Sequence, residues 1–128
     1  MSSDLNDPKQ HKKIIGFRFA WNGIREVYKS EKNFRIHLLA TAIVIGIGVL
    51  LGVSALEWSV LALICSLVIS LEMVNSSVER VIDYLAPEHH PLAGIIKDIS
   101  AGAVLISSIG AVIIAICIFL PKILHMLS

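Results

Sequence analysis

Three long stretches of the sequence contain no Asp, Glu, Lys or Arg, and they constrain the fold more than any other feature. They are Ile36–Leu56, Trp58–Leu71 and Ile99–Pro121. A helix needs about 20 residues to cross a hydrocarbon core of about 30 Å, so the first and third are long enough alone. The second continues without a helix breaker into a polar segment, Glu72–Tyr84. We therefore predict three transmembrane helices, of which the second carries polar residues into the membrane.

The composition excludes other classes of protein. Of the 128 residues, 55% are hydrophobic and only 16% are charged. A soluble domain of this size cannot bury so much apolar surface, and a disordered chain does not have this composition. The formal net charge of +1 is too balanced to suggest a nucleic-acid partner. We expect a small, all-α integral membrane protein.

The positions of the basic residues predict the orientation. Eight of the 11 Lys and Arg residues precede the first apolar stretch, which places the N-terminus in the cytoplasm. The link Val53–Glu57 then lies outside, the segment Asp83–Asp98 lies inside and the C-terminus lies outside. Because the first 35 residues contain no short apolar core of a secretory signal, we expect no cleavage.

The basic N-terminal segment has the pattern of an amphipathic helix. An apolar stripe at spacings of three and four is surrounded by Lys and Arg: Ile14, Phe17, Trp21, Ile24 and Tyr28. Such a helix can lie on the inner membrane surface near anionic headgroups, or pack on the spans, and the two are compatible. We predict a polar tail over residues 1–11, an amphipathic interfacial helix over 12–34 and a three-span transmembrane domain over 35–128.

Small residues predict close helix packing. Gly48 and Gly52 are four residues apart inside an apolar stretch, where they favour helix contacts over a nucleotide-binding loop. Ala103, Ser107 and Ala111 form a similar face on the third span. Since three helices bury little surface, we expect a homo-oligomer.

The segment Leu71–Tyr84 contains the most informative pattern. Five polar residues fall within one sector about 100° wide on a helix: Glu72, Asn75, Ser76, Glu79 and Asp83. Counted from Trp58 at the outer interface, Glu72 lies about 21 Å deep, near the inner headgroups. Function is the default explanation for an ionisable residue at such a depth.

Phosphoryl transfer is one chemistry that needs these groups. A pair of carboxylates can hold Mg²⁺ together with water and phosphate oxygens, and a further carboxylate can accept a proton from a lipid hydroxyl. Lys97 can offset the charge of the phosphate. Two alternatives remain open: a structural network in which Glu72 or Glu79 pairs with Arg80, Lys97 or another chain, and a path for cations or protons.

The segment EMVNSSVERVID, Glu72–Asp83, resembles the signature of the prokaryotic diacylglycerol kinase family. The resemblance covers about residues 12–120, and further matches are Glu31 with Phe34 and Arg35, Trp21 to Gly23, Glu88 to His90, and Lys97 with Asp98. It implies a small homotrimeric enzyme of a bacterial inner membrane, with a surface helix, three spans, ATP as co-substrate and Mg²⁺ as cofactor.

The resemblance also implies roles for individual residues. Glu72 would be the catalytic base, and Asn75 would orient the reacting groups beside it. Glu31 and Glu79 would bind the Mg²⁺ that accompanies ATP. The other implied contacts with ATP are Lys97, Asp98, Glu88, His89, His90, Lys12 and Phe19. Those near the lipid headgroup are Trp21, Arg25 and Arg35. Reasoning from the residues alone favours Glu72, Glu79 and Lys97, and does not select Glu31.

Two short stretches bear on which lipid is phosphorylated. Asn33–Ala40 (NFRIHLLA) and His90–Ala93 (HPLA) look closer to the undecaprenol kinase branch than to the diacylglycerol branch. We therefore expect undecaprenol as the acceptor, with diacylglycerol as the alternative. Outside the kinases, the rival hypotheses are a non-catalytic membrane scaffold and a small transporter or channel subunit.

Overall fold

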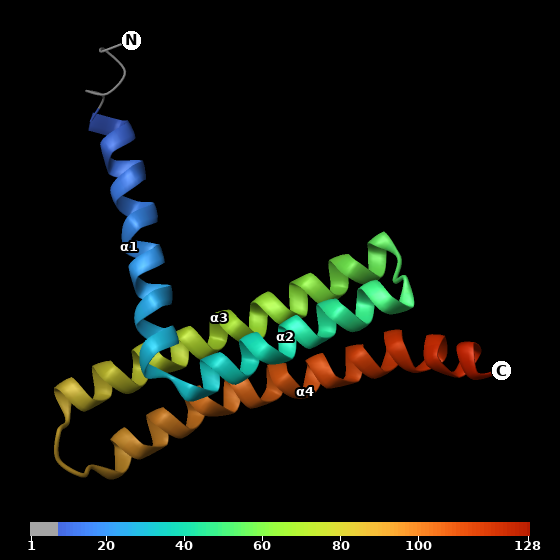
Figure 1. Ribbon diagram of the computed structural model, residues 1–128. Coiled ribbons are helices and arrows are strands. Elements are labelled where there is room, and N and C mark those ends of the chain that lie inside the picture. Colours follow the sequence, from blue (N-terminus) through green and yellow to red (C-terminus); the bar gives the residue numbers. More distant parts are fainter. Residues whose placement is uncertain (1–7) are drawn as a thin grey trace.

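The computed structural model describes the backbone of residues 8–128 and the side chains of residues 16–128, which form four helices and no strand. The helices are α1 (Pro8–Ser30), α2 (Lys32–Leu51), α3 (Ala55–Leu85) and α4 (Pro91–Leu127). In Figure 1, α2, α3 and α4 lie side by side as a bundle, and α1 projects steeply from it. The last three helices are long and apolar enough to span a membrane, so the predicted fold class is confirmed.

The chain turns sharply between α1 and α2, where only Glu31 separates the two helices. Glu31 has an extended backbone (φ −110°, ψ 111°) and is the N-cap of α2. The Arg35 Nη1 donates to the carbonyl oxygens of Tyr28 at 2.7 Å and Lys29 at 3.2 Å, which lie at the end of α1. Because the last carbonyls of a helix have no partner within it, these bonds stabilise the turn. The turn falls earlier than the boundary expected at Arg35.

The turn between α2 and α3 is shorter than the expected link Val53–Glu57. Gly52 ends α2 in the left-handed region (φ 64°), which glycine adopts without strain. Ser54 then begins α3 through a capping box, in which the Glu57 amide donates to the Ser54 Oγ at 3.2 Å. These two caps place the first turn of α3 directly after α2.

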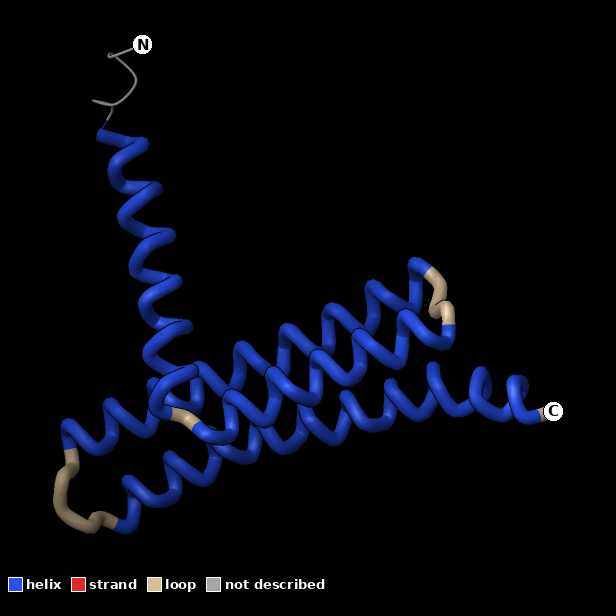
Figure 2. Tube along the Cα trace, in the orientation of Figure 1, coloured by secondary structure: helices blue, strands red, loops and turns tan. Residues whose placement is uncertain are grey.

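The helices differ in length, and this difference positions the polar half of α3. At about 1.5 Å per residue, α2 is about 30 Å long, α3 about 46 Å and α4 about 55 Å. Since α2 and α3 meet at their short turn, the excess length of α3 lies at its other end. Figures 1 and 2 show this end of α3, with the start of α4 and the loop that joins them, extending past the turn between α1 and α2.

The bundle leaves most of its apolar surface outside. One small cluster of buried apolar side chains, Val53, Leu61 and Phe119, lies near the α2–α3 turn, with partly buried neighbours that include Trp58. Large apolar side chains of α4 such as Ile106 and Ile113 remain exposed. Exposed apolar faces on helices of this length are the surface that lipid or another helix covers.

The apolar stripe of α1 also faces outward. Trp21 and Tyr28 are each 53% exposed, and Val27 is the only described side chain of α1 that is buried. The stripe therefore does not pack on the spans along most of its length, which favours the surface-helix interpretation over the packing one. Ile14 lies outside the residues whose side chains are described.

Gly48 packs closely on α3, as predicted, whereas Gly52, predicted to pack as well, ends α2 with open space around it. A Cβ atom at Gly48 would lie 2.6 Å from the Cη2 of Trp58, whereas one at Gly46 would meet nothing within 4 Å. Both Gly→Ala changes alter helix propensity equally, so the difference between them isolates the contact with Trp58. We expect Gly48→Ala to be less stable than Gly46→Ala by about 1–3 kcal/mol, measured by unfolding in detergent. Equal stabilities would contradict the close packing.

Candidate functional site

The polar face of α3 passes from the bundle interior to the outside. Glu72, Asn75 and Ser76 are buried, Glu79 is half-buried and Asp83 is exposed. The burial follows from the lengths of the helices, because α2 begins near Ser76 and covers only the part of α3 before it. The predicted stripe therefore faces the bundle at one end and the surrounding solution or headgroups at the other.

Glu31 joins this face from the opposite side. Its carboxylate accepts a hydrogen bond from the Ser76 Oγ at 3.0 Å, and it makes no capping hydrogen bond to α2. Glu31 and Glu79 are both close enough to Glu72 to interact with its charge. Three carboxylates from two segments therefore gather where α1 turns into α2. The residues alone did not select Glu31, because the turn that brings it there contains neither Gly nor Pro.

Asn75 lies between two of these carboxylates with one of its polar atoms unused. Its Nδ2 donates to the Glu79 Oε1 at 3.4 Å. Its buried Oδ1 has no partner among the described residues. Buried amide oxygens are rarely left without a donor or a cation, so this oxygen favours a ligand at this place.

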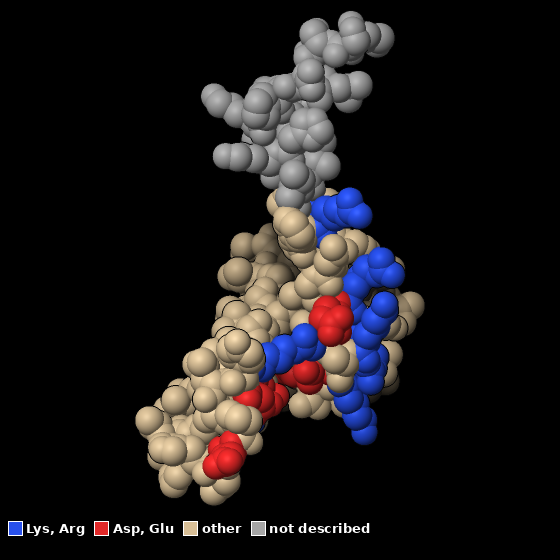
Figure 3. Space-filling model, turned by 90° about the vertical axis from the view of Figure 1, so that its left-hand side faces the viewer, with Lys and Arg blue, Asp and Glu red and all other residues tan. Residues whose placement is uncertain are grey.

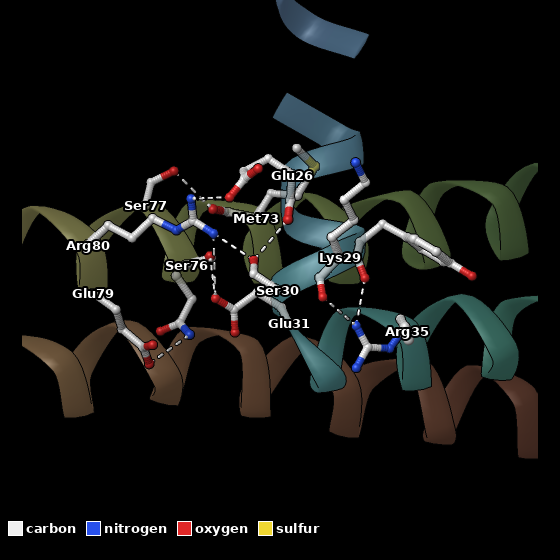
Figure 4. A network of polar contacts seen from close by, with 12 residues as sticks. Glu26, Lys29, Ser30, Glu31, Arg35, Met73, Ser76, Ser77, Glu79 and Arg80 are labelled. Carbon is white, nitrogen blue, oxygen red and sulfur yellow. Dashed lines mark hydrogen bonds and ion pairs between the residues drawn. The ribbon is translucent and has the colours of Figure 1, made fainter. Parts of the chain in front are cut away.

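Arg80 connects α3 to the end of α1 (Figure 4). Its guanidinium donates to the Ser30 Oγ at 2.6 Å and to the Glu26 Oε1 at 3.4 Å, and lies 4.0 Å from the Glu31 Oε1. The structural network considered from the sequence pairs Glu72 or Glu79 with Arg80 or Lys97, and the described residues form no such ion pair. Arg80 pairs with carboxylates of α1 and the turn rather than with Glu72 or Glu79.

Lys97 lies at the outer edge of the group. It forms an ion pair with Asp83 across α3 and α4, and it is close enough to Glu79 to interact with its charge. Asp98 is exposed beside it. In Figure 3, which views this end of the molecule, acidic side chains gather near a row of basic ones.

The loop between α3 and α4 contains the other predicted nucleotide contacts. Glu88 and His89 are exposed there. The His90 Nδ1 accepts from the Leu92 amide at 3.2 Å and so caps α4. Phe19 is exposed on α1, and the side chain of Lys12 lies outside the described residues.

The predicted lipid contacts border a crevice between α1 and the bundle. Trp21 and Arg25 line a cavity of about 780 Å³ together with Phe34 and Met73, so its wall is mainly apolar. Met73 is adjacent to Glu72 in sequence. Arg35, by contrast, points back to the carbonyls at the end of α1.

The donor set fits Mg²⁺ bound together with phosphate. No group of three or more His, Cys, Asp and Glu side chains able to hold a metal is gathered within the described part of the chain. Mg²⁺ in nucleotide sites is held by one or two carboxylates plus water and phosphate oxygens, rather than by a protein cage. Glu31, Glu79 and the unpartnered Oδ1 of Asn75 supply oxygens of the kind that Mg²⁺ prefers.

Comparisons with known proteins identify the family. The family model described as "Prokaryotic diacylglycerol kinase" matches residues 18–119. The chain belongs to this family. It is a multi-pass membrane protein and a phosphotransferase with a lipid alcohol as acceptor, so the resemblance and the predicted reaction class are confirmed.

Individual relatives carry two different names. The chain is 40% identical to "Diacylglycerol kinase" of Synechocystis sp. over 115 residues, 89% of this chain and 66% of that protein. It is 36% identical to "Undecaprenol kinase" of Bacillus subtilis over 121 residues, 91% of this chain and 98% of that protein. It is also 36% identical to "Diacylglycerol kinase" of Escherichia coli K12 over 95 residues, 74% and 78% of the two chains. The names alone do not select one lipid.

Arg80 should hold the end of α1 against α3. We expect Arg80→Gln to speed hydrogen exchange of the amides of Val27–Ser30 about two- to fivefold, because a partly exposed ion pair contributes less than about 1 kcal/mol. Arg18→Gln, on the exposed surface of the same helix, is the matched control and should leave that exchange unchanged. Unchanged protection in the Arg80 variant would show that Arg80 does not hold α1.

Proposed function

We propose that this protein is an ATP- and Mg²⁺-dependent kinase that transfers the γ-phosphate of ATP to the hydroxyl of undecaprenol. The proposal rests on the gathering of Glu31, Glu72 and Glu79, with the unpartnered oxygen of Asn75. Their neighbours in the sequence, Phe34 and Met73, border an apolar crevice. Carboxylates in that position can serve both a nucleotide from the aqueous side and a hydroxyl from the lipid side. Membership of a lipid kinase family supports this interpretation.

Glu72 acts as the general base in this proposal. It accepts the proton of the lipid hydroxyl as the hydroxyl oxygen attacks the γ-phosphorus, the bond from that phosphorus to the ADP oxygen breaks, and ADP leaves. The position of Glu72 supports the role, because about 21 Å of helix separates it from Trp58, at a depth that an acceptor embedded in lipid can reach. Asn75, one turn further along the same face, orients the reacting groups.

Glu31 and Glu79 hold Mg²⁺ with the phosphates of ATP, and bound Mg²⁺ supplies charge neutralisation for the transferring group. Lys97 and Asp98 contact the nucleotide from the outer edge, where the ion pair with Asp83 orients Lys97. Glu88, His89 and His90 border the nucleotide on the loop side. Lys12 and Phe19 of α1 complete the ATP contacts in this proposal.

The lipid reaches Glu72 from the side, through the crevice lined by Trp21 and Arg25, and Arg25 and Arg35 lie near its headgroup. An open, mainly apolar crevice suits any long chain that ends in a primary hydroxyl. The Bacillus relative supports undecaprenol, because its match spans 98% of that protein. The Synechocystis relative supports the alternative, diacylglycerol, through its 40% identity.

The proposal also includes the cellular location and the oligomeric state of the protein. The excess of Lys and Arg before α2 supports a cytoplasmic N-terminus in the inner membrane of a bacterium. The exposed apolar faces of the bundle support association with further copies, which we propose to be a homotrimer on the strength of the family resemblance.

The test is transfer of labelled γ-phosphate from Mg·ATP by the purified full chain in mixed micelles, with undecaprenol and diacylglycerol offered separately. We expect label in undecaprenyl phosphate. Preferential labelling of diacylglycerol would overturn the choice of lipid and keep the kinase. Label in neither lipid, from folded protein, would favour the scaffold hypothesis.

Glu72→Gln tests the role of the base in the same assay. We expect it to lower transfer by at least about 100-fold, because an amide cannot accept the proton, while unfolding in detergent stays unchanged. Glu57→Gln is the matched control, since it makes the same change at the other end of α3, where Gln also satisfies a capping box. Full activity of Glu72→Gln would remove Glu72 from the mechanism.

A further inference from the structure

Among the described residues, His37 is the one titratable side chain in direct contact with Glu72. The Glu72 side chain is 5% exposed, and its Oε2 lies 3.8 Å from the Nε2 of His37 on α2. Among the described residues no hydrogen bond and no other ion pair involves the Glu72 carboxylate. A carboxylate inside an apolar bundle is costly unless it is paired, so this one contact has a large share in how Glu72 is held.

His37 reaches Glu72 from the face of α2 that packs on the bundle. Phe34, three residues before it, is buried, and Thr41, four residues after it, is half-buried. These spacings place all three residues on one face. The His37 side chain is 23% exposed, and the Thr41 Oγ1 donates to the His37 carbonyl at 2.9 Å. The imidazole therefore points toward α3 and away from the lipid side.

We propose that His37 is a positioning residue for the catalytic base, a role that rests on the proposed function of Glu72. The His37 Nε2 holds the Oε2 of Glu72, which leaves the Oε1 to accept the proton of the lipid hydroxyl. The 3.8 Å separation is longer than a hydrogen bond, and contacts of this kind commonly shorten when substrate binds. Orientation matters because a carboxylate that rotates away from the hydroxyl cannot act as a base.

Substitutions at His37 separate positioning from packing. His37→Leu removes the nitrogen and keeps apolar bulk. His37→Gln keeps an N–H donor at about the reach of Nε2, and His37→Asn keeps the polarity but its amide is too short to reach. We expect His37→Leu and His37→Asn to lower kcat for lipid phosphorylation about 10- to 100-fold, with the KM for ATP changed less than about twofold. We expect kcat of His37→Gln to lie within about threefold of that of the unmodified protein.

One control makes the His→Leu substitution at another histidine, and a second replaces the catalytic base Glu72. His125→Leu, at the exposed C-terminal end of α4, should leave kcat unchanged. Equal losses in the Gln and Asn variants, or full kcat in both Leu and Asn, would overturn the positioning role. Should His37→Leu fail to fold, the comparison of Gln with Asn decides alone.

Glu72→Gln in the same series tells the two proposals apart. If it is inactive while Leu and Asn at position 37 are fully active, Glu72 remains the base and only the role of His37 is wrong. If Glu72→Gln is itself active, the proposed base is wrong, and the role of His37 falls with it.

Discussion

A helix that brings carboxylates into an apolar bundle must meet polar partners there, and the arrangement of this protein depends on that constraint. In α3 the requirement is met by segments far away in the sequence: Glu31 accepts from Ser76, and His37 contacts Glu72. Both partners belong to α2 or to the turn before it. The position of that turn therefore decides which polar groups of α3 lie inside the bundle and which lie beyond it.

The difference in helix length turns this packing into a site with two kinds of access. Because α3 and α4 extend past the start of α2, the same polar face is buried at Glu72 and exposed at Asp83. The buried end adjoins residues that border an apolar crevice, and the exposed end adjoins Lys97. A reaction between a lipid and a water-soluble nucleotide needs an apolar and an aqueous surrounding close together, and this helix passes through both. Arg80 bonds to Ser30 at the end of α1 and so holds α1 beside this part of α3.

The sequence predicted the spans and the polar stripe, because the length of a charge-free stretch and the periodicity of a helix can both be recognised within one segment. These patterns could not predict the contacts of Glu31, since Ser30–Asn33 contains neither Gly nor Pro. The turn is stabilised by Arg35, which bonds to carbonyls six and seven residues earlier. His37 was missed for a similar reason. A lone histidine within an apolar stretch shows no function until the partner from α3 is in place. Family resemblance supplied Glu31, which the patterns alone did not.

Paramagnetic relaxation by Mn·ATP would show whether the nucleotide binds at the carboxylate end of α3. Nitroxide labels would be placed singly at Tyr84→Cys and Met126→Cys, after Cys65 and Cys117 are replaced by Ser. Tyr84 is about 8 Å along the helix from Glu79, whereas Met126 lies at the far end of α4. We expect strong broadening of the label at position 84 and little at position 126. Equal broadening, or broadening at position 126 alone, would contradict the site.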